Sequence, residues 1–324
     1  SAGATPKPAS TAKRAAWPGA GANPSRTSPD HTDVTQACQI EGVDVRGRLV
    51  RLGPERAKVL DAHGYPDAVS TILAETLALG CALSSALKYD GLFTLQVQSD
   101  GPISLMVADI TSDGAMRGYA RFDEARVAAA QNAKGAVVPR MLGVGHMAFT
   151  VDQGDDMERY QGVTALEGST LAVCAQNYFR HSEQLETAIF MATNIDDGMP
   201  QVGALMVQRM PQQLITDEAE AEDGRRRSVA MLASLSGDEM LDVNLDSDTL
   251  LYRLYHEDGV RAYPPQAVVH RCRCSHDKVS RTLKSFPRAE VVTDDGHAQV
   301  VCEFCKATYD FDVAALDALY GARD

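Results

Sequence analysis

Four of the seven cysteines lie in two close pairs near the C-terminus, Cys272-Arg273-Cys274 and Cys302-Glu303-Phe304-Cys305. Two thiol pairs separated by 27 residues can supply a complete tetrahedral sulfur site for one zinc ion. The tail that carries them has few large apolar side chains. It also lies in the size range where small domains need a metal ion or disulfides to be stable. Metal binding would then become part of its folding free energy. We therefore predict that these four cysteines bind one zinc ion per chain.

The spacing of the first pair favours a chemical role as well as a structural one. A Cys-x-Cys pair is tighter than the usual Cys-x-x-Cys knuckle, and a disulfide within it would close a small, strained ring. Strained disulfides have higher reduction potentials and are often regulatory. From the residues alone, a reversible redox switch and an inert structural zinc module both stay open. His270, His276 and His297 are near enough to compete as ligands, but four thiolates complete the shell, so we expect these histidines at the surface.

The second pair, Cys302-x-x-Cys305, could also belong to a thioredoxin-like oxidoreductase. That chemistry requires the pair at the start of a helix in a βαβ unit. Val300-Val301 before the pair and the alternating residues 306–311 after it indicate strands instead. No G-x-G-x-x-G or Walker pattern is present, and the glycines before His146 indicate a turn. No catalytic residue can be named, and we predict that the protein is not an enzyme.

The other cysteines occur singly. Cys81 and Cys174 lie within apolar helical patterns and are expected in the core, whereas Cys38 has no clear context. An odd number of cysteines and the lack of a secretory apolar segment favour a reducing compartment, which we take to be the cytoplasm. Residues 1–30 are rich in Ala, Pro, Ser and Gly and carry basic residues. They predict a disordered extension, although a cleaved targeting segment shares this bias and would place the protein in an organellar matrix.

The charge balance restricts the partners. Thirty-one basic against 44 acidic residues give a net charge of −13, which argues against nucleic-acid binding. The longest apolar stretch, residues 68–87, is interrupted by polar residues such as Glu75, so no membrane span is expected.

Hydrophobic periodicity predicts an α+β fold in which antiparallel strands are grouped with interspersed helices. A long helix opens at Pro66-Asp67, and a second helix follows Ser169, with Ser169 or Thr170 as its N-cap. Turn dipeptides separate most of the expected strands, which cover residues 45–52, 93–97, 103–107, 116–121, 147–151, 188–192 and 202–207. The last two should pair across a turn at residues 196–198.

The composition changes after Met210. Residues 217–227 form a dense charge block, and two short amphipathic helical stretches follow at 229–235 and 250–255, the second with Ser247 as its expected N-cap. Helices this short are only marginally stable in isolation, so they must pack on a neighbouring element. We expect four parts, namely the extension, an N-terminal α+β domain, a metastable helical linker and a cysteine-rich C-terminal domain, at residues 1–30, 31–210, 211–265 and 266–324.

Two blocks of short motifs match one known protein family. One block consists of the two cysteine pairs followed by Tyr309-Asp310-Phe311. The second block consists of four short motifs, Tyr160-Gln161-Gly162-Val163, Leu166-Glu167-Gly168, Tyr178-Phe179 and Ser182-Glu183-Gln184. Through these blocks the sequence, over about residues 33–315, resembles the heat-shock protein 33 family of redox-regulated chaperones.

The resemblance implies an ATP-independent holdase that binds unfolding client proteins under oxidative stress. In the reduced, inactive state Cys272, Cys274, Cys302 and Cys305 would all hold zinc. Oxidation would pair Cys272 with Cys274 and Cys302 with Cys305, release the metal and unfold the linker. The N-terminal domain would bind substrate and dimerise, so the oxidised form is expected to be a homodimer. The alternatives are a zinc-ribbon interaction module with constitutive binding and a thiol oxidoreductase.

Overall fold

The computed structural model describes residues 32–154, 159–194, 201–210, 215, 217–293 and 296–321. Within these residues the chain forms two six-stranded sheets, one two-stranded sheet and several helices, which confirms the predicted α+β class. The extension at residues 1–30 and the turn at residues 196–198 lie outside the described residues.

The first large sheet, sheet A, is antiparallel and has the strand order β10-β1-β2-β9-β8, with β11 also paired to β1. The pairing of β8 with β9 confirms the predicted strand pair at residues 188–192 and 202–207. Its strands are β1 (Val34–Ile40), β2 (Val45–Leu52), β8 (Thr187–Asn194), β9 (Gln201–Arg209), β10 (Val260–Ala262) and β11 (Gln266–Ala267).

The second large sheet, sheet B, has the order β12-β5-β4-β3-β6-β7. The predicted meander is confirmed, because β3, β4 and β5 pair in sequence with antiparallel registers. Strand β12 pairs with β5 in parallel, so the chain runs along the edge of sheet B immediately before Cys272. The strands are β3 (Leu92–Ser99), β4 (Ile103–Thr111), β5 (Ala115–Phe122), β6 (Gly145–Asp152), β7 (Tyr160–Ala165) and β12 (Val269–His270).

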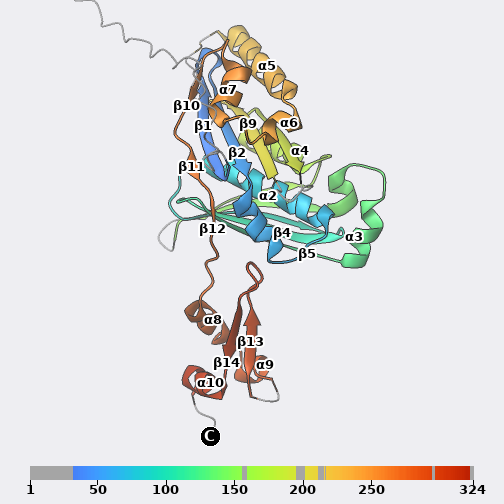
Figure 1. The fold of residues 1–324 in the computed structure, drawn as a ribbon, viewed down its shortest axis with the longest axis vertical. Helices are drawn as coiled ribbons and strands as arrows, with labels where there is room; N and C mark the ends of the chain where they lie inside the picture. Colours follow the sequence, from blue (N-terminus) through green and yellow to red (C-terminus); the bar gives the residue numbers. More distant parts are fainter. Residues whose placement is uncertain are drawn as a thin grey trace, which may run out of the picture.

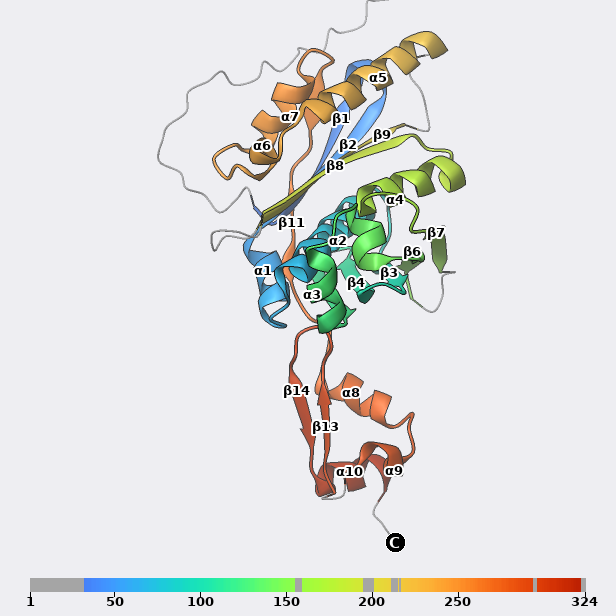
Figure 2. The ribbon, with the colours of Figure 1, turned by 90° about the vertical axis from the view of Figure 1, so that its right-hand side faces the viewer.

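Helix α2 (Asp67–Ser85) lies between the two sheets and contacts strands of both (Figure 2). Gly118 on β5 permits its close approach, since a Cβ there would lie 2.8 Å from Leu77 Cδ2. Among the described helices, α2 alone has the length and composition of a membrane span, and 78% of that window is buried inside the fold. It is therefore the central helix of the core, as the interrupted apolar pattern indicated.

Smaller helical elements complete the N-terminal part. Thr170 caps α4 by accepting a hydrogen bond from the Val173 amide, which confirms one of the two predicted caps. Cys81 and Cys174 are buried as expected, and Cys38 is buried too. The elements are η2 (Glu41–Val43), α1 (Pro54–Asp61), α3 (Glu124–Gln131), η3 (Val138–Leu142), α4 (Leu171–Tyr178) and η4 (Phe179–Glu183).

Three helices follow residue 217: α5 (Glu218–Ser234), α6 (Gly237–Leu241) and α7 (Ser247–Tyr255). Two sequence expectations need correction here. The charge block is not separate from the helix predicted at residues 229–235 but belongs to the same 17-residue helix, because Glu222 pairs with Arg225 and Arg226 one turn later. The N-cap of α7 is Asp246, whose carboxylate accepts from the Thr249 amide at 2.8 Å, and not Ser247.

Helices α5–α7 cover the face of sheet A that points away from α2 (Figures 1 and 2). The interface is a second apolar core, distinct from the one around α2. Sheet A contributes Ile40, Val45, Leu49, Leu205 and Val207, η2 contributes Val43, and the helical segment contributes Leu232, Leu235, Met240, Leu245, Leu250, Leu251 and Tyr255.

The C-terminal tail extends below sheet B in Figure 1 and has a small core of its own. Beyond β12, the described residues of the tail bury four apolar side chains, those of Leu283, Ala298, Phe311 and Leu316. Its elements are α8 (His276–Leu283), α9 (Arg288–Val291), β13 (Ala298–Val301), β14 (Thr308–Phe311) and α10 (Val313–Tyr320), with β13 and β14 forming an antiparallel hairpin.

The largely buried Glu75 on α2 generates a pH prediction. Burial raises the pKa of its carboxyl from 4.5 to about 7, against the opposing effect of the Thr193 hydroxyl. The pKa of this carboxyl is higher in the folded chain than in the unfolded one, so the folded state binds the proton more tightly. The stability that this proton binding contributes is fully present below about pH 4.5 and is lost as the pH rises through about 7. Glu75→Gln should therefore increase the free energy of unfolding at pH 8 by about 2–3 kcal/mol and flatten its pH dependence. Urea unfolding at pH 5 and pH 8 measures this, with exposed Glu257→Gln as the control that should change neither value.

Candidate metal centre

The structure brings the four cysteines of the tail together. Their sulfur atoms all lie within 4.8 Å of one another, and no other residue of the described chain joins the group. Cys272 Sγ and Cys302 Sγ are 3.8 Å apart, and Cys274 Sγ and Cys305 Sγ are 3.4 Å apart. Four sulfurs at tetrahedral positions, each about 2.3 Å from zinc, would be separated by about 3.8 Å. The donor set and its spacing therefore fit a tetrahedral zinc site.

Two local structures position these sulfurs. Cys302 and Cys305 stand in the turn of the β13–β14 hairpin, where the Lys306 amide donates to Cys302 O and the Cys302 amide to Ala307 O, each at 2.9 Å. Cys272 and Cys274 lie on the extended segment between β12 and α8, and Ser275 directly after them caps α8. The Cys-x-x-Cys pair is thus in a hairpin and not at a helix start, so the predicted absence of a thioredoxin context is confirmed.

The three neighbouring histidines lie outside the sulfur group. His297 is exposed, as expected, and His276 is exposed while its ring rests 4.6 Å from the ring of Phe311. His270 departs from the expectation of a surface residue, since it is half-buried and its amide donates to Glu55 Oε2 at 2.6 Å. The reason is that β12 packs against α1, a contact between residues far apart in the sequence.

Further groups donate hydrogen bonds to the sulfurs. The Tyr309 hydroxyl donates to Cys274 Sγ at 3.0 Å, which raises the pKa of Tyr309 to about 12. Burial opposes ionisation of Cys272, but hydrogen bonds, first from the Cys274 amide, outweigh it and lower the pKa of Cys272 to about 7. Burial raises the pKa of Cys305 to about 12. A thiolate is therefore favoured at Cys272 in particular, which suits both metal binding and oxidation.

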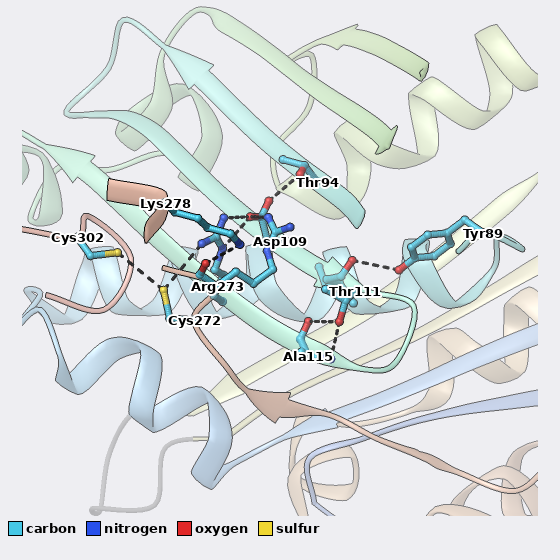
Figure 3. Close-up of polar contacts among 11 residues, drawn as sticks. Tyr89, Thr94, Asp109, Thr111, Ala115, Cys272, Arg273, Lys278 and Cys302 are labelled. Atoms are coloured by element: carbon cyan, nitrogen blue, oxygen red, sulfur yellow. Dashed lines mark hydrogen bonds and ion pairs between the residues drawn. The ribbon is translucent and has the colours of Figure 1, made fainter. Parts of the chain in front are cut away.

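Sequence reasoning did not find the residues of sheet B that contact this centre. Arg117 and Tyr119 of β5 both contact Phe304, and the buried Asp109 of β4 binds Arg273, which stands between two of the cysteines (Figure 3). The available signal was the alternation along β5, where Met116, Gly118 and Ala120 face the core and the large residues between them must face outward.

The sequence profile of one protein family, described as Hsp33 protein, matches residues 33–312. A 33 kDa chaperonin of Caulobacter vibrioides is 40% identical over 292 residues, which cover 86% of this chain and 95% of that protein. A 33 kDa chaperonin of Photorhabdus laumondii is 38% identical over 283 residues, covering 86% of this chain and 93% of the relative.

A solved structure shares the fold. The crystal structure of the 33 kDa chaperonin (heat shock protein 33 homolog) of Thermotoga maritima superposes with a TM-score of 0.75. It is 21% identical in sequence, and the alignment covers 89% of this chain and 98% of that one.

Replacing single cysteines tests the ligand set. With Co²⁺ as the probe, the wild-type chain should bind one ion per chain with the sulfur-to-metal charge-transfer absorption of a tetrahedral thiolate site. Cys272→Ser and Cys302→Ser should each reduce this absorption and weaken binding by at least tenfold. Cys174→Ala, in the core of the N-terminal part, should leave the spectrum unchanged. Unaltered cobalt spectra in both tail variants would contradict the four-cysteine site.

Proposed function

Because this chain belongs to the heat-shock protein 33 family, a family of chaperones, we propose that it is a redox-regulated, ATP-independent holdase. It would bind unfolding proteins under oxidative stress and stay inactive while reduced and loaded with zinc. The observation that carries this proposal is the convergence of four cysteine sulfurs in a tail that has little other core. Three domains form part of the proposal. Residues 31–210 would bind substrate and dimerise, residues 211–265 would form a metastable helical linker, and residues 266–324 would form the zinc-binding redox switch.

The tail depends on its sulfur site for stability. With four buried apolar side chains beyond β12 in its described residues, it lacks the apolar burial that holds the rest of the chain together. Bound zinc would supply a cross-link among Cys272, Cys274, Cys302 and Cys305, a contribution on the order of 10 kcal/mol to folding. This cross-link joins the β13–β14 hairpin to the segment that leaves β12. Without it, the two would be held by the small core of the tail and by contacts such as that of the His276 ring with Phe311.

Oxidation would remove the cross-link. Each disulfide forms when two thiolates lose two electrons to a peroxide, whose O–O bond breaks and which takes up two protons to leave as water. Two such steps would join Cys272 to Cys274 and Cys302 to Cys305. The sulfurs of a disulfide carry no negative charge and are poor ligands, so the site would lose its affinity for the cation.

The linker helices provide the surface that such a switch would expose. Arg51 of β2 is almost fully buried beneath them and donates to the carbonyls of Leu245 and, at 3.1 Å, of Glu239. Gln36 of β1 donates to Asp248 at 2.7 Å. Arg225 of α5 also pairs with Glu186, directly before β8, at 2.5 Å, and apolar packing on sheet A holds the helices in addition. Their departure would expose an extended apolar face to which unfolding clients can bind.

Three further assignments follow from family membership as proposals. The oxidised protein would form a homodimer through its N-terminal domain. It would act in the cytoplasm, or in an organellar matrix if residues 1–30 are a targeting segment. Its partners would be unfolded proteins, with no nucleic acid and no membrane.

The central experiment follows zinc release and chaperone activity together. We expect the reduced chain to contain one zinc and to leave the thermal aggregation of an unrelated protein unchanged. Peroxide should release the zinc and suppress aggregation without ATP, and dithiothreitol with zinc should reverse both. Suppression by the reduced form would favour a constitutive zinc-ribbon module, and catalytic turnover of small disulfides would favour an oxidoreductase. Zinc release without any gain of suppression would contradict the switch.

Loosening the linker should activate the chain without oxidant. Leu251 of α7 is 0% exposed in the core between the linker and sheet A, so Leu251→Ala should weaken that packing by about 2–5 kcal/mol. The reduced variant should then suppress aggregation to a substantial fraction of the oxidised wild type while retaining its zinc. Val243→Ala, in the same segment but 47% exposed, is the matched control and should behave as wild type.

A further inference from the structure

The outward face of β5 contacts the metal-binding hairpin at three alternate positions. Arg117 places its guanidinium carbon 3.7 Å from the centroid of the Phe304 ring. Tyr119 meets the same ring edge-on, with centroids 4.8 Å apart. Arg121 pairs with Glu303 at 3.3 Å, although both of these side chains are about 60% exposed. Phe304 of the Cys302–Cys305 turn is thus held by the N-terminal sheet through Arg117 and Tyr119, whereas the exposed pair of Arg121 with Glu303 is screened by solvent and contributes little.

Arg117 makes the most extensive of these contacts. Its side chain is 14% exposed. Its Nε and Nη2 atoms donate to Asp109 Oδ2 at 2.8 Å and 2.6 Å, and its Nη1 atom lies 3.8 Å from Cys272 Sγ. One guanidinium therefore contacts a cysteine of the first pair and the turn of the second pair. The hydrogen bonds from Nε and Nη2 to Asp109 fix the guanidinium in that position, because they engage both donors on one of its edges.

Asp109 anchors the arrangement to the sheet. Its side chain is 6% exposed and accepts hydrogen bonds from Thr94 of β3 at 2.6 Å, from Arg117, and from Arg273 at 3.1 Å (Figure 3). Arg273 lies between Cys272 and Cys274, so the buried carboxylate holds one arginine from the sheet and one from the metal-binding segment. Lys278 adds a third cation through its hydrogen bond to Arg273 O at 2.8 Å.

The charges at this contact are complementary to a metal-thiolate centre. The three cations Arg117, Arg273 and Lys278 exceed the one carboxylate, Asp109, by two positive charges. A zinc ion with four thiolates carries a formal double negative charge. The contact is balanced while the thiolates are present. After they are oxidised, Arg117 and Arg273 would still share the buried carboxylate of Asp109, but the negative charge of the thiolates would be gone.

From these contacts we propose that Arg117 is a positioning residue of the metal centre. It acts from the N-terminal sheet, holding Cys272 and the Phe304 turn so that the metal is retained and the tail stays docked on β5. The inference rests on the proposed zinc-binding function and adds to it a direct connection between the sheet and the centre. The sheet would then set how readily the centre opens, independently of the linker.

Zinc release from the reduced full-length chain to a chromogenic chelator tests this role. Removing a group that orients metal ligands typically costs 10- to 100-fold in metal affinity. We expect Arg117→Gln to release zinc about tenfold faster than wild type, both with and without peroxide. Arg117→Lys keeps the positive charge but loses the paired donors to Asp109 and the flat surface that stacks on Phe304. Its rate of zinc release should lie between those of wild type and Arg117→Gln. Arg121→Gln, on the same strand and also bound to the turn but exposed, is the matched control and should release zinc at the wild-type rate.

A second variant tests the contact from the tail and leaves the sheet intact. Phe304→Leu keeps an apolar side chain but removes the ring beneath Arg117, and should speed zinc release several-fold. The Co²⁺ charge-transfer band should shift in Arg117→Gln and stay in place in Arg121→Gln, which a merely structural role for Arg117 would not produce. Urea unfolding of the N-terminal part serves as the check on folding.

The outcomes separate this inference from the function on which it rests. A wild-type chain without bound metal, or without activation by peroxide, would contradict the proposed function itself. A metal-loaded, switching wild type whose Arg117→Gln variant releases zinc at the same rate and shows the same cobalt band would overturn the role of Arg117. Equal acceleration by Arg121→Gln would assign the effect to surface charge and would overturn it as well.

Discussion

The meeting of four sulfurs between a hairpin turn and the segment leaving β12 is the constraint on which the C-terminal tail depends. Beyond β12, the described residues of the tail bury only four apolar side chains, so apolar packing alone gives it little stability. The same sulfurs can hold a metal as thiolates or pair as disulfides, but not both at once. In the proposed function, the stability of the tail would therefore depend on the oxidation state of these sulfurs.

In the proposed function, sheet A would connect the state of the tail to a large apolar surface. One face packs on α2 within the main core, and the other is covered by α5–α7. Strands β10 and β11 lead from these helices back to β1, and β12 then joins β5 immediately before Cys272. The covering segment and the tail are therefore continuous along the chain, and in the proposed function a change in the tail would act on strands at the edges of both sheets. Polar side chains such as Arg51 fix the position of α5–α7 on sheet A without adding much buried apolar area.

Much of the fold could be predicted from local patterns. The alternation of Phe93, Leu95 and Val97 predicted β3, and the apolar face that begins at Val69 predicted α2, because both periodicities report directly which side of an element is buried. The start of α5 was placed too late, because a charge block is ambiguous until its i,i+3 and i,i+4 pairs are seen on a helix. The cap of α7 was misplaced by one residue, because Asp246 and Ser247 are both good cap residues.

The sequence by itself determined which chemistry is open to this protein, because two close pairs of cysteines can bind a metal ion as thiolates or form disulfides with one another. It could not show that Arg117 and Asp109, more than 150 residues earlier, lie beside those cysteines. That contact arises only when β12 pairs with β5 and directs the tail across the polar face of sheet B. Side-chain types are written in the chain, but contacts between distant segments are set by the packing of whole sheets, which no local pattern records.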